Sequence, residues 1–342
     1  MYCLSRIFVF RDPGEVESMA DYTIRSLDRH NEKDRCAWAR FMSHAPGATI
    51  FHLPDFLSYH QDRFHEHHLA IYKGEELFGI MPLAIIGQDG VKTARSPYGA
   101  SYGGMIFSSL PTYDASKRIA KELICYLNAA GVKQLIITPP PGIYYPSYSD
   151  TFIFSLLEHG FRHVNSNITS VVKLVDNIER DLYNMRARRA IAKARKAELH
   201  IIEQADLDIF WGLMEKTFAR HGTKPTHTLM EFKYLQAVLP AHVRVDIAYK
   251  DATPVAGIAY FKINDLVNMS FYICSDPEYR DLQGVSLIVH HGILNSLQAG
   301  FRYFDLGTSS INMVGNEHIF EFKENFGACG CFRHTYLWEA DS

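Results

Sequence analysis

Two stretches of this chain follow one plan, and that plan predicts the fold. PDFLSYHQDRFHEHHLAIYKGEELFGIMPLAI occupies residues 54–85, and MEFKYLQAVLPAHVRVDIAYKDATPVAGIAYFKI occupies residues 230–263. Each stretch reads as an amphipathic helix, a strand ending in Tyr-Lys, a turn, and a second strand containing Gly-Ile. The matching dipeptides are Tyr72-Lys73 with Tyr249-Lys250, and Gly79-Ile80 with Gly257-Ile258. This agreement indicates an internal duplication.

The similarity continues downstream in the same order. ELICYLNAAGVKQLIIT (122–138) and HGILNSLQAGFRYFDLG (291–307) each combine a helix that is closed by a glycine with a short apolar strand. Phe-Arg-His then recurs at 161–163 and 332–334, in each copy after a glycine. Any chain that alternates helices and strands is somewhat self-similar, but four matches in one order favour a duplication.

Each copy alternates helices and strands after its hairpin, which predicts an α/β fold with a mixed sheet and helices on the faces of the sheet. The length of 342 residues suits two domains. We predict the domains as residues 1–172 and residues 173–342, the second beginning with a basic helix. The apolar run at residues 1–12 is interrupted by Arg6, so it predicts a first strand rather than a signal peptide.

Composition and charge are those of an ordinary globular protein. Hydrophobic residues make up 47% of the chain, charged residues 21%, and the net charge is −3. Proteins that coat nucleic acid are usually more basic, so we expect any anion site to be local. No stretch reaches the roughly 18 apolar residues that a membrane span requires. With six scattered cysteines, which suit reduced and buried thiols better than disulfides, this predicts a cytoplasmic protein without a membrane span.

NIERDLYNMRARRAIAKARKAE, residues 177–198, predicts one helix with Asn177 as its N-cap and with Met185 and Ile191 on its core side. Residues 186–196 hold six basic side chains and no acidic one. Four of them follow helical spacing and form a basic stripe: Arg186, Arg189, Lys193 and Lys196. Two interpretations are equally open. The stripe binds phosphates or another polyanion, or it is a solvated face that acids from elsewhere balance.

A resemblance to a known family lies in four segments, in order: MRARRAIAKARKAELHI, FWGLMEKTFARHGTKPTHTLMEFKYL, FDLGTSS and EFKENFGA. They resemble the FemAB-like GNAT acyltransferases, and SPYGASYGG (96–104) is similar to the corresponding N-terminal loop of these proteins. The resemblance covers most of residues 50–335 and implies two tandem GNAT-like domains.

The resemblance also implies an activity, the transfer of an acyl or aminoacyl group to an amine of a cell-wall, polysaccharide or lipid precursor. The donor would be an acyl-CoA thioester or an aminoacyl-tRNA, with no metal, and the acceptor a small or carrier-linked amine. If the donor is an aminoacyl-tRNA, tRNA would be a partner of this protein. The alternative function is a non-catalytic ligand-binding protein that keeps the cleft and the anion-binding helix.

Three residues are candidates for catalysis. The resemblance places Lys323, in EFKENFG, in the active cleft facing charge on the substrate. Asp305 ends an apolar strand, where α/β sheets bind ligands, so it is a candidate base or amine-binding group; capping the next loop is the equally open alternative. Tyr272 lies on the strand expected to splay open, and its hydroxyl is a candidate to protonate a leaving thiolate, with plain packing as the alternative.

The candidate binding residues come from four segments. For the substrate they are Tyr98 and Tyr102 in the glycine-rich loop, Arg186, Arg189 and Lys193 on the basic stripe, and Arg220 and His221 in FARHGTKPT. For the donor, YRDLQGVSLIVHHG offers Arg280, Gln283 and Gly284 at a helix N-terminus, where amides bind phosphate.

The donor segment lacks the full Q/R-x-x-G-x-G/A pattern that CoA-binding GNAT units usually show, which speaks against ordinary acetyl-CoA binding. The sequence also shows no inserted coiled-coil arm, which favours a small acyl donor over tRNA. The histidine clusters at 65–68 and 290–291 lack partners at metal-ligand spacing, so we predict no metal site.

Overall fold

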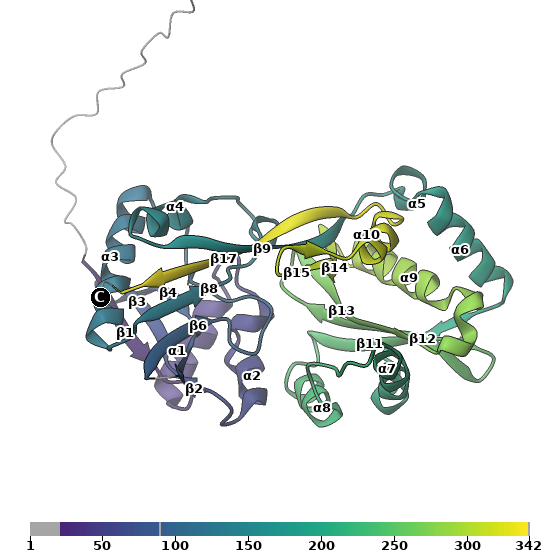
Figure 1. Ribbon diagram of the computed structural model, residues 1–342, viewed down its shortest axis with the longest axis horizontal. Helices are drawn as coiled ribbons and strands as arrows, with labels where there is room; N and C mark the ends of the chain where they lie inside the picture. Colours follow the sequence, from purple (N-terminus) through teal and green to yellow (C-terminus); the bar gives the residue numbers. More distant parts are fainter. Residues whose placement is uncertain (1–20, 89, 341–342) are drawn as a thin grey trace, which may run out of the picture.

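The structure is a computed structural model that describes residues 21–88 and 90–340. The strand predicted within residues 1–12 lies outside the described residues. Two α/β units lie side by side, and the chain passes from the first to the second along β9 (Arg162–Lys173) (Figure 1). Within the described residues, no helix combines the length and the apolar character that crossing a membrane would demand.

The first unit contains β1 to β8 and α1 to α4. Its strands are β1 (Tyr22–Leu27), β2 (His65–Glu66), β3 (His68–Lys73), β4 (Glu76–Met81), β5 (Ala84–Gln88), β6 (Val91–Ser96), β7 (Ile106–Phe107) and β8 (Gln134–Ile137). Its helices are α1 (Glu32–Met42), α2 (Pro54–Leu57), α3 (Tyr113–Ala129) and α4 (Thr151–Glu158), with short 3-10 turns η1 (Ile50–His52), η2 (Ser58–His60) and η3 (Gly142–Tyr144).

The second unit repeats this order. Its strands are β10 (His200–Ile202), β11 (Val243–Lys250), β12 (Thr253–Lys262), β13 (Val267–Ser275), β14 (Tyr303–Thr308), β15 (Ser310–Ile311), β16 (Val314–Gly315) and β17 (Cys329–Glu339). Its helices are α5 (Ile178–Asp181), α6 (Met185–Lys196), α7 (Leu207–His221), α8 (Leu229–Val238), η4 (Pro277–Leu282), α9 (Gly284–Gln298) and α10 (Glu317–Glu324).

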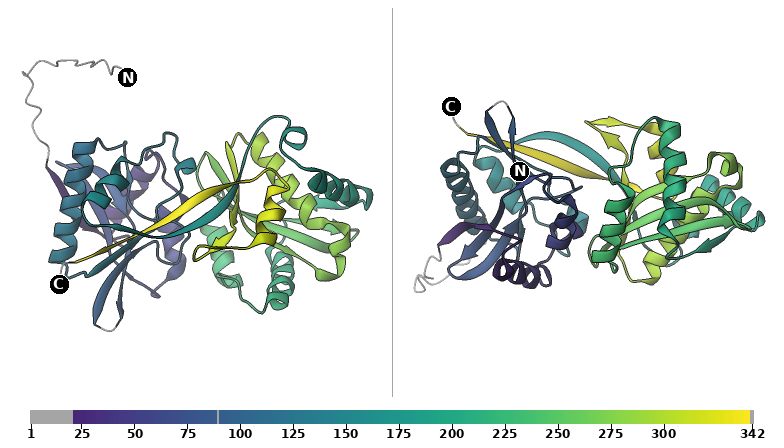
Figure 2. Two further views of the ribbon diagram at one scale, coloured as in Figure 1. Left: turned by 45° about the horizontal axis from the view of Figure 1, so that its top comes forward. Right: turned by 90° about the horizontal axis from the view of Figure 1, so that it is seen from below.

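One mixed sheet runs through both units. Its eleven strands follow the order β10-β11-β12-β13-β14-β9-β17-β8-β6-β5-β2, while β1-β3-β4-β7 form a separate sheet in the first unit. The last strand, β17, pairs with both β9 and β8, so the second half of the chain returns to the first unit (Figure 2). The domain boundary between residues 172 and 173 stays a prediction, and the shared strands mean that each half completes the sheet of the other.

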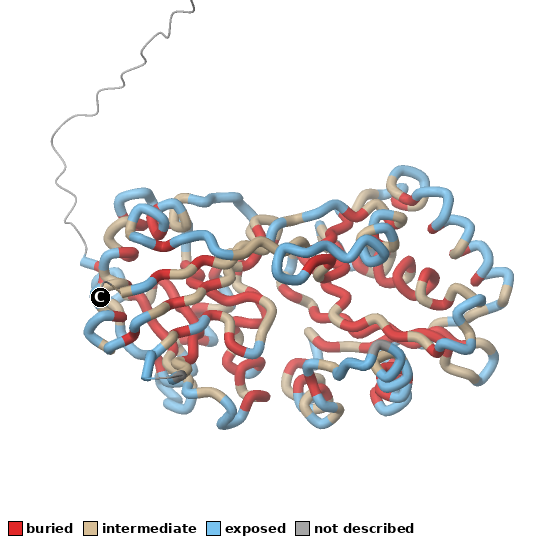
Figure 3. Tube along the Cα trace, viewed as in Figure 1, coloured by how far each residue is buried: buried red, intermediate tan, exposed pale blue. Residues whose placement is uncertain are grey.

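Apolar packing joins the units as well as the sheet. Figure 3 shows the buried residues concentrated on the strands of both units, while α6 on the outside is largely exposed. A single core cluster contains Trp38 and Phe56 of the first unit together with Phe232 and Phe261 of the second. The rings of Phe56 and Phe261 lie 6.2 Å apart across the interface. Burial of these large aromatic surfaces is the main force that holds the two units together.

The duplication predicted from the hairpins is present in the structure. In both β3–β4 and β11–β12 the register shifts next to the Tyr-Lys pair, between Ile71 and Tyr72 and between Ala248 and Tyr249. Both glycines lie on the second strand of their hairpin, Gly79 opposite Ile71 and Gly257 opposite Ile247. A Cβ on Gly79 would lie 3.0 Å from the Phe107 ring, and one on Gly257 2.8 Å from the Phe210 ring. The glycines therefore let each hairpin pack closely against its neighbours.

The two Phe-Arg-His segments, residues 161–163 and 332–334, do not occupy equivalent places in the structure. Gly160 and Gly327 do correspond, since both have positive φ and both precede a long strand by two residues. Phe161 follows the first glycine directly, whereas Phe332 lies inside β17. This part of the predicted repeat is therefore coincidental.

The basic segment is not one helix from 177 to 198. The chain breaks after α5, and Asn184 rather than Asn177 caps α6, its side chain accepting hydrogen bonds from the amides of Arg186 and Ala187. The prediction that Met185 faces the core is wrong, because the break turns Met185 out to solvent and leaves the core face of α6 to Ala187, Ile191 and Ala194.

The cysteines are less buried than predicted. Cys274 is buried and Cys331 partly buried, but Cys36, Cys125 and Cys329 are exposed, because they lie on the outer faces of helices or at a strand end. All five are free thiols.

Candidate active site

The sheet of the second unit opens between β13 and β14. These strands pair in parallel only over three residues, from Val267 opposite Tyr303 to Met269 opposite Asp305. Beyond that point β13 carries a bulge, because Ala259 and Tyr260 of β12 face Tyr272 and Ser270 and leave Phe271 as the extra residue. A bulge leaves its extra backbone group outside the ladder and is frequent beside active sites. The opening therefore has a free backbone segment on one wall.

A cleft of about 690 Å³ lies at the end of this opening, and we call it the C-terminal cleft. It is bounded by the end of β13, η4, the start of α9, α6 and α10. Its lining includes five residues predicted to bind substrate or donor, namely Arg186, Arg220, Arg280, Gln283 and Gly284. The fold thus brings together side chains that are almost a hundred residues apart in the sequence.

The N-terminus of α9 opens into this cleft without a cap. Gln283 precedes the helix in the left-handed conformation, with φ of 62°, and its side chain makes no capping hydrogen bond. Gly284 follows, and a Cβ there would lie 3.1 Å from Val255 and Ala256, so glycine lets α9 lie directly against β12. The first amides of a helix lack partners within the helix, and they carry the positive end of its dipole. Uncapped, they form an anion site.

Both acidic and basic side chains line the C-terminal cleft, and the basic ones are three arginines. Arg186 forms an ion pair with Glu321 on α10, and Glu278 and Asp281 also line the cleft. Arg220 and Arg280 are exposed and form no ion pair with any residue in 21–88 or 90–340. Two guanidinium groups are thus available for a phosphate.

The basic stripe begins at this cleft and runs outward along α6. Arg186 lines the cleft, whereas Arg189, Lys193 and Lys196 are exposed and do not. Acids from elsewhere balance the helix in part, because Glu321 pairs with Arg186 and Glu179 with Arg195. The structure therefore supplies features of both interpretations of the stripe, and the role of its outer part stays a prediction.

A second group of residues, which we call the junction cluster, lies where β14, β9 and β17 meet. It consists of Asp305, Tyr144, Thr169, Lys323, Arg333 and Tyr102. Asp305 is completely buried, and its carboxylate accepts hydrogen bonds from Tyr144 Oη and Thr169 Oγ1, each at 2.5 Å, and from Gly307 N at 2.7 Å. Three donors of the fold thus hold both carboxylate oxygens, and Asp305 orders the cluster from a buried position.

Lys323 reaches this cluster from α10. Its side chain is 6% exposed, and Nζ donates hydrogen bonds to the carbonyl oxygens of Gly307 at 2.7 Å and Thr308 at 2.8 Å. Burial lowers the pKa of Lys323 to about 8, although the nearby Asp305 carboxylate acts in the opposite direction. Phe322 of α10 and Phe326, two residues beyond its end, line the C-terminal cleft. One short helix thus carries both the cleft wall and the lysine.

The cluster includes residues that the sequence did not single out. Arg333 lies over the ring of Tyr102 at 4.6 Å and donates hydrogen bonds to Thr308 Oγ1 and, at 3.0 Å, to the carbonyl of Ser101 in the glycine-rich loop. Its Nε is buried without a partner among the described residues. Its only sequence signal was the Phe-Arg-His repeat, while Tyr144 and Thr169 had none.

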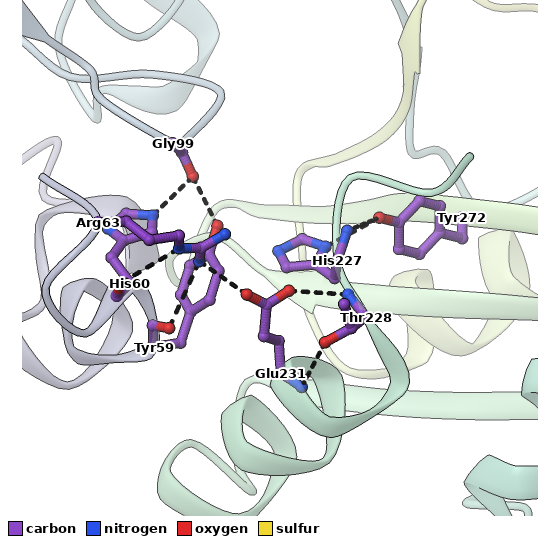
Figure 4. Close-up of polar contacts among 8 residues, drawn as sticks. All are labelled: Tyr59, His60, Arg63, Gly99, His227, Thr228, Glu231 and Tyr272. Carbon is purple, nitrogen blue, oxygen red and sulfur yellow. Dashed lines mark hydrogen bonds and ion pairs between the residues drawn. The ribbon is translucent and has the colours of Figure 1, made fainter. Parts of the chain in front are cut away.

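Two predicted tyrosines lie elsewhere. Tyr272 Oη lies 2.8 Å from His227 Nδ1 and accepts a hydrogen bond from the His227 amide (Figure 4). Burial lowers the pKa of His227 to about 4, so the ring is neutral and accepts the phenol proton. Tyr272 is not among the residues that line the C-terminal cleft. Tyr98 donates to Glu66 at 3.1 Å, inside the first unit. The side chain of His221 lies outside the described residues.

The glycine-rich loop is held from the interface between the units. Tyr59 Oη and His60 Nε2 donate to the carbonyl of Gly99 at 2.7 Å and 3.0 Å, and Arg63 on the same segment pairs with Glu231 of α8 at 2.9 Å (Figure 4). These contacts place Ser101 and Tyr102, from the first unit, against Arg333 near the end of the chain.

Removing the Tyr144 hydroxyl tests the junction cluster. We expect Tyr144→Phe to lower the free energy of unfolding by about 1–3 kcal/mol, because the buried Asp305 carboxylate loses a donor that nothing replaces. Tyr148→Phe is the control, since that exposed hydroxyl bonds Asp150 at the surface and its loss should change stability by less than about 0.5 kcal/mol. Urea denaturation measures both. Equal losses in the two variants would contradict a structural role for the cluster.

Residues 183–324 match the acetyltransferase (GNAT) domain family. Among curated proteins, none matches this chain in sequence. Several solved structures share the fold along nearly their whole length. FemX matches with a TM-score of 0.68 at 12% identity, covering 90% of this chain and 96% of FemX.

Two further structures support the same fold. L-PGS from Bacillus licheniformis matches with a TM-score of 0.60 at 10% identity, covering 92% of this chain and 93% of that protein. A tandem GNAT protein from the clavulanic acid biosynthesis pathway matches with a TM-score of 0.54 at 12% identity, covering 94% and 99%. The prediction of a mixed α/β fold with two tandem GNAT-like domains is confirmed.

Proposed function

We propose that this chain, which carries a GNAT acetyltransferase domain within a tandem GNAT fold, transfers an acyl group from a phosphate-bearing donor to an amine. One observation carries the proposal: the uncapped N-terminus of α9 opens into a cleft that also presents Arg220 and Arg280. Helix amides and guanidinium groups that converge in one cleft bind phosphate. A volume of about 690 Å³ suits a nucleotide-sized ligand.

The opening between β13 and β14 suggests where the acyl group lies. A donor that is anchored by its phosphates at α9 directs its acyl arm along β13 toward the bulge at Phe271. There a backbone amide outside the ladder is available to polarise the acyl carbonyl. The acceptor amine, once deprotonated, attacks the carbonyl carbon and forms a tetrahedral oxyanion. Collapse of that species breaks the C–S or C–O bond and expels the thiolate or alkoxide of the donor, and the proton that the attacking nitrogen loses balances the proton that this leaving group takes up.

Lys323 supplies positive charge beside this path. With a pKa of about 8 its ammonium is mostly protonated at neutral pH, so it stabilises negative charge that develops in the transition state. Asp305 and Arg333 position the carbonyl groups and the loop around it. Holding both reactants in line supplies much of the rate, and no covalent enzyme intermediate is required.

We take the donor to be an acyl-CoA, because the cleft of about 690 Å³ collects Arg220, Arg280 and the start of α9 in one place, and we take the acceptor to be a cell-envelope precursor. Two of the solved structures with this fold are FemX and L-PGS, and they support acyl or aminoacyl transfer in general terms only.

Calorimetry with CoA, acetyl-CoA and a long-chain acyl-CoA tests the proposal directly. We expect micromolar binding that weakens with added salt, and no binding of pantetheine, which lacks the phosphates. Binding followed by transfer to an amine would support an enzyme, whereas binding without transfer to any amine would favour the ligand-binding alternative. If no CoA binds and an aminoacyl-tRNA does, the donor assignment is wrong and the tRNA form replaces it.

A further inference from the structure

We propose that a second cleft binds a hydrocarbon chain. It is lined mainly by the first unit and by β17, with Leu266, Arg302 and Tyr303 of the second unit at its edge. This N-terminal cleft has a volume of about 770 Å³. Its walls are mainly rings and branched apolar side chains, among them Phe107, Ile137, Pro139, Phe152, Phe332 and Tyr336.

The N-terminal cleft is the counterpart of the C-terminal cleft in the duplicated fold. The C-terminal cleft lies among the end of β13, the start of α9, and α10. The N-terminal cleft lies among β7, the start of α3, and α4, which occupy the same places in the order of the first unit. The chain therefore has two equivalent openings, and their linings can be compared element by element.

The N-terminal cleft lacks the uncapped helix start of its counterpart. The side chain of Thr112 caps α3 by accepting from Ala115 N at 3.3 Å, whereas the start of α9 has no side-chain cap. Thr112 stands at the N-cap of α3, where Gln283 stands at that of α9, and the apolar Leu110 and Pro111 precede it in the cleft wall. An anion site built on free helix amides is thus found in the second copy and not at α3.

The lining offers few free polar groups for a polar ligand. Binding sites for sugars or nucleotides need several convergent polar groups. Among the buried side-chain polar atoms without a partner in residues 21–88 and 90–340, none belongs to this lining. Among its polar side chains, Tyr148 bonds Asp150 and His334 bonds Ser166 at 2.9 Å. Arg302 is the exception, because it is exposed and forms no ion pair with any residue in 21–88 or 90–340.

The rim exposes large apolar side chains that a chain-like ligand would cover. Phe154 on α4 is 54% exposed and Phe332 on β17 is 57% exposed, and Leu110 is exposed beside them. Contiguous apolar surface of this kind marks a binding site in soluble proteins. Burial of methylene groups between aromatic rings and prolines supplies the affinity.

The cleft adjoins the junction cluster. Ile143 and Tyr145 line it, and Tyr144 between them bonds Asp305. A chain bound here would therefore bring its polar end toward Asp305 and Lys323. If the bound hydrocarbon chain is part of the acceptor, the acceptor is a lipid amine, and this assignment rests on the proposed function. The binding of a hydrocarbon chain in the cleft does not rest on it.

Fluorescence titration with cis-parinaric acid, a fatty acid that becomes fluorescent in apolar sites, tests the proposal on the full chain. We expect saturable binding that dodecanoate displaces better than octanoate, and octanoate better than butyrate. The double variant Phe154→Glu/Phe332→Glu should bind about tenfold more weakly or worse. Met230→Glu is the matched control, because Met230 is 73% exposed on α8 and does not line the cleft.

Three results would overturn the proposal: equal binding by the double variant and the wild type when circular dichroism shows both folded, no dependence on chain length, or displacement by glucosamine but not by dodecanoate. A failure of CoA to bind in the calorimetric test would leave this result standing. The two proposals therefore fail separately.

Discussion

Lys323→Met is expected to lower the rate of acyl transfer about 100-fold or more, while leaving donor affinity within about threefold of wild type. Methionine keeps the length of the side chain but removes the charge that faces the carbonyls of Gly307 and Thr308. The loss should fall on kcat because the ammonium acts on charge that develops only in the transition state. Single-turnover kinetics with a saturating donor measures it.

The matched control is Lys196→Met, which removes an exposed lysine of the basic stripe that lines neither cleft. Its kcat should equal that of the wild type. A Lys323→Met protein that is folded and fully active would remove this lysine from the site. A loss of donor binding instead of kcat would make it a binding residue.

The pH dependence of Lys323 provides an independent check on the same group. Because the pKa of Lys323 is about 8, the rate should fall above pH 8 as the ammonium loses its proton, and Lys323→Arg should move that fall to higher pH. Stability changes in the opposite direction. The unfolded lysine keeps its proton to about pH 10.5, so between the two pKa values the unfolded state binds more protons, and this group's contribution to stability rises with pH.

Reversing the charges of the C-terminal cleft is the second large effect that we expect. Arg220→Glu/Arg280→Glu should weaken CoA binding about 100-fold or more, because two charge-assisted bonds to phosphate become repulsions. Both side chains are exposed and have no ion-pair partner among the described residues, so the fold should be retained. Calorimetry with CoA measures the change, and circular dichroism checks the fold.

The double variant Arg189→Glu/Lys193→Glu carries the same change of charge on the outer part of the basic stripe. We expect it to reduce CoA affinity by less than about threefold, because salt screens charges at this distance from the cleft. The reverse pattern, in which only the stripe variant loses binding, would place the anion along α6. An extended polyanion such as tRNA would then be the better ligand.

Much of the fold was predictable because its signals are local. The Tyr-Lys and Gly-Ile pairs mark equivalent strands in the two hairpins, and alternation of helices and strands indicates the mixed sheet. The exchange of β9 and β17 between the units was not predictable. Strand pairing joins residues such as Arg162 and Leu337 that are far apart in the chain, and nothing in either segment specifies its neighbour.

The candidate site divides in the same way. The uncapped helix start at Gln283 and Gly284 and the arginines around it could be proposed from residue type and spacing, because a helix N-terminus is a local structure. The helix break at Asn184 was not predicted. The basic run suggested one continuous helix, but the side chain of Asn184 bonds the first backbone amides of α6 and so starts a new helix there.

The sequence by itself determined the duplicated α/β plan and the start of the helix at Gly284, and it indicated residues that can bind an anion, since these follow from periodicity and from residue type. Only the tertiary structure decided which of these residues meet. It set Arg220 and Arg280 on one cleft, buried Asp305 among Tyr144, Thr169 and Gly307, and turned Tyr272 toward His227. Burial and the close contacts that come with it arise from packing between distant segments, and such packing also lowers the pKa of Lys323.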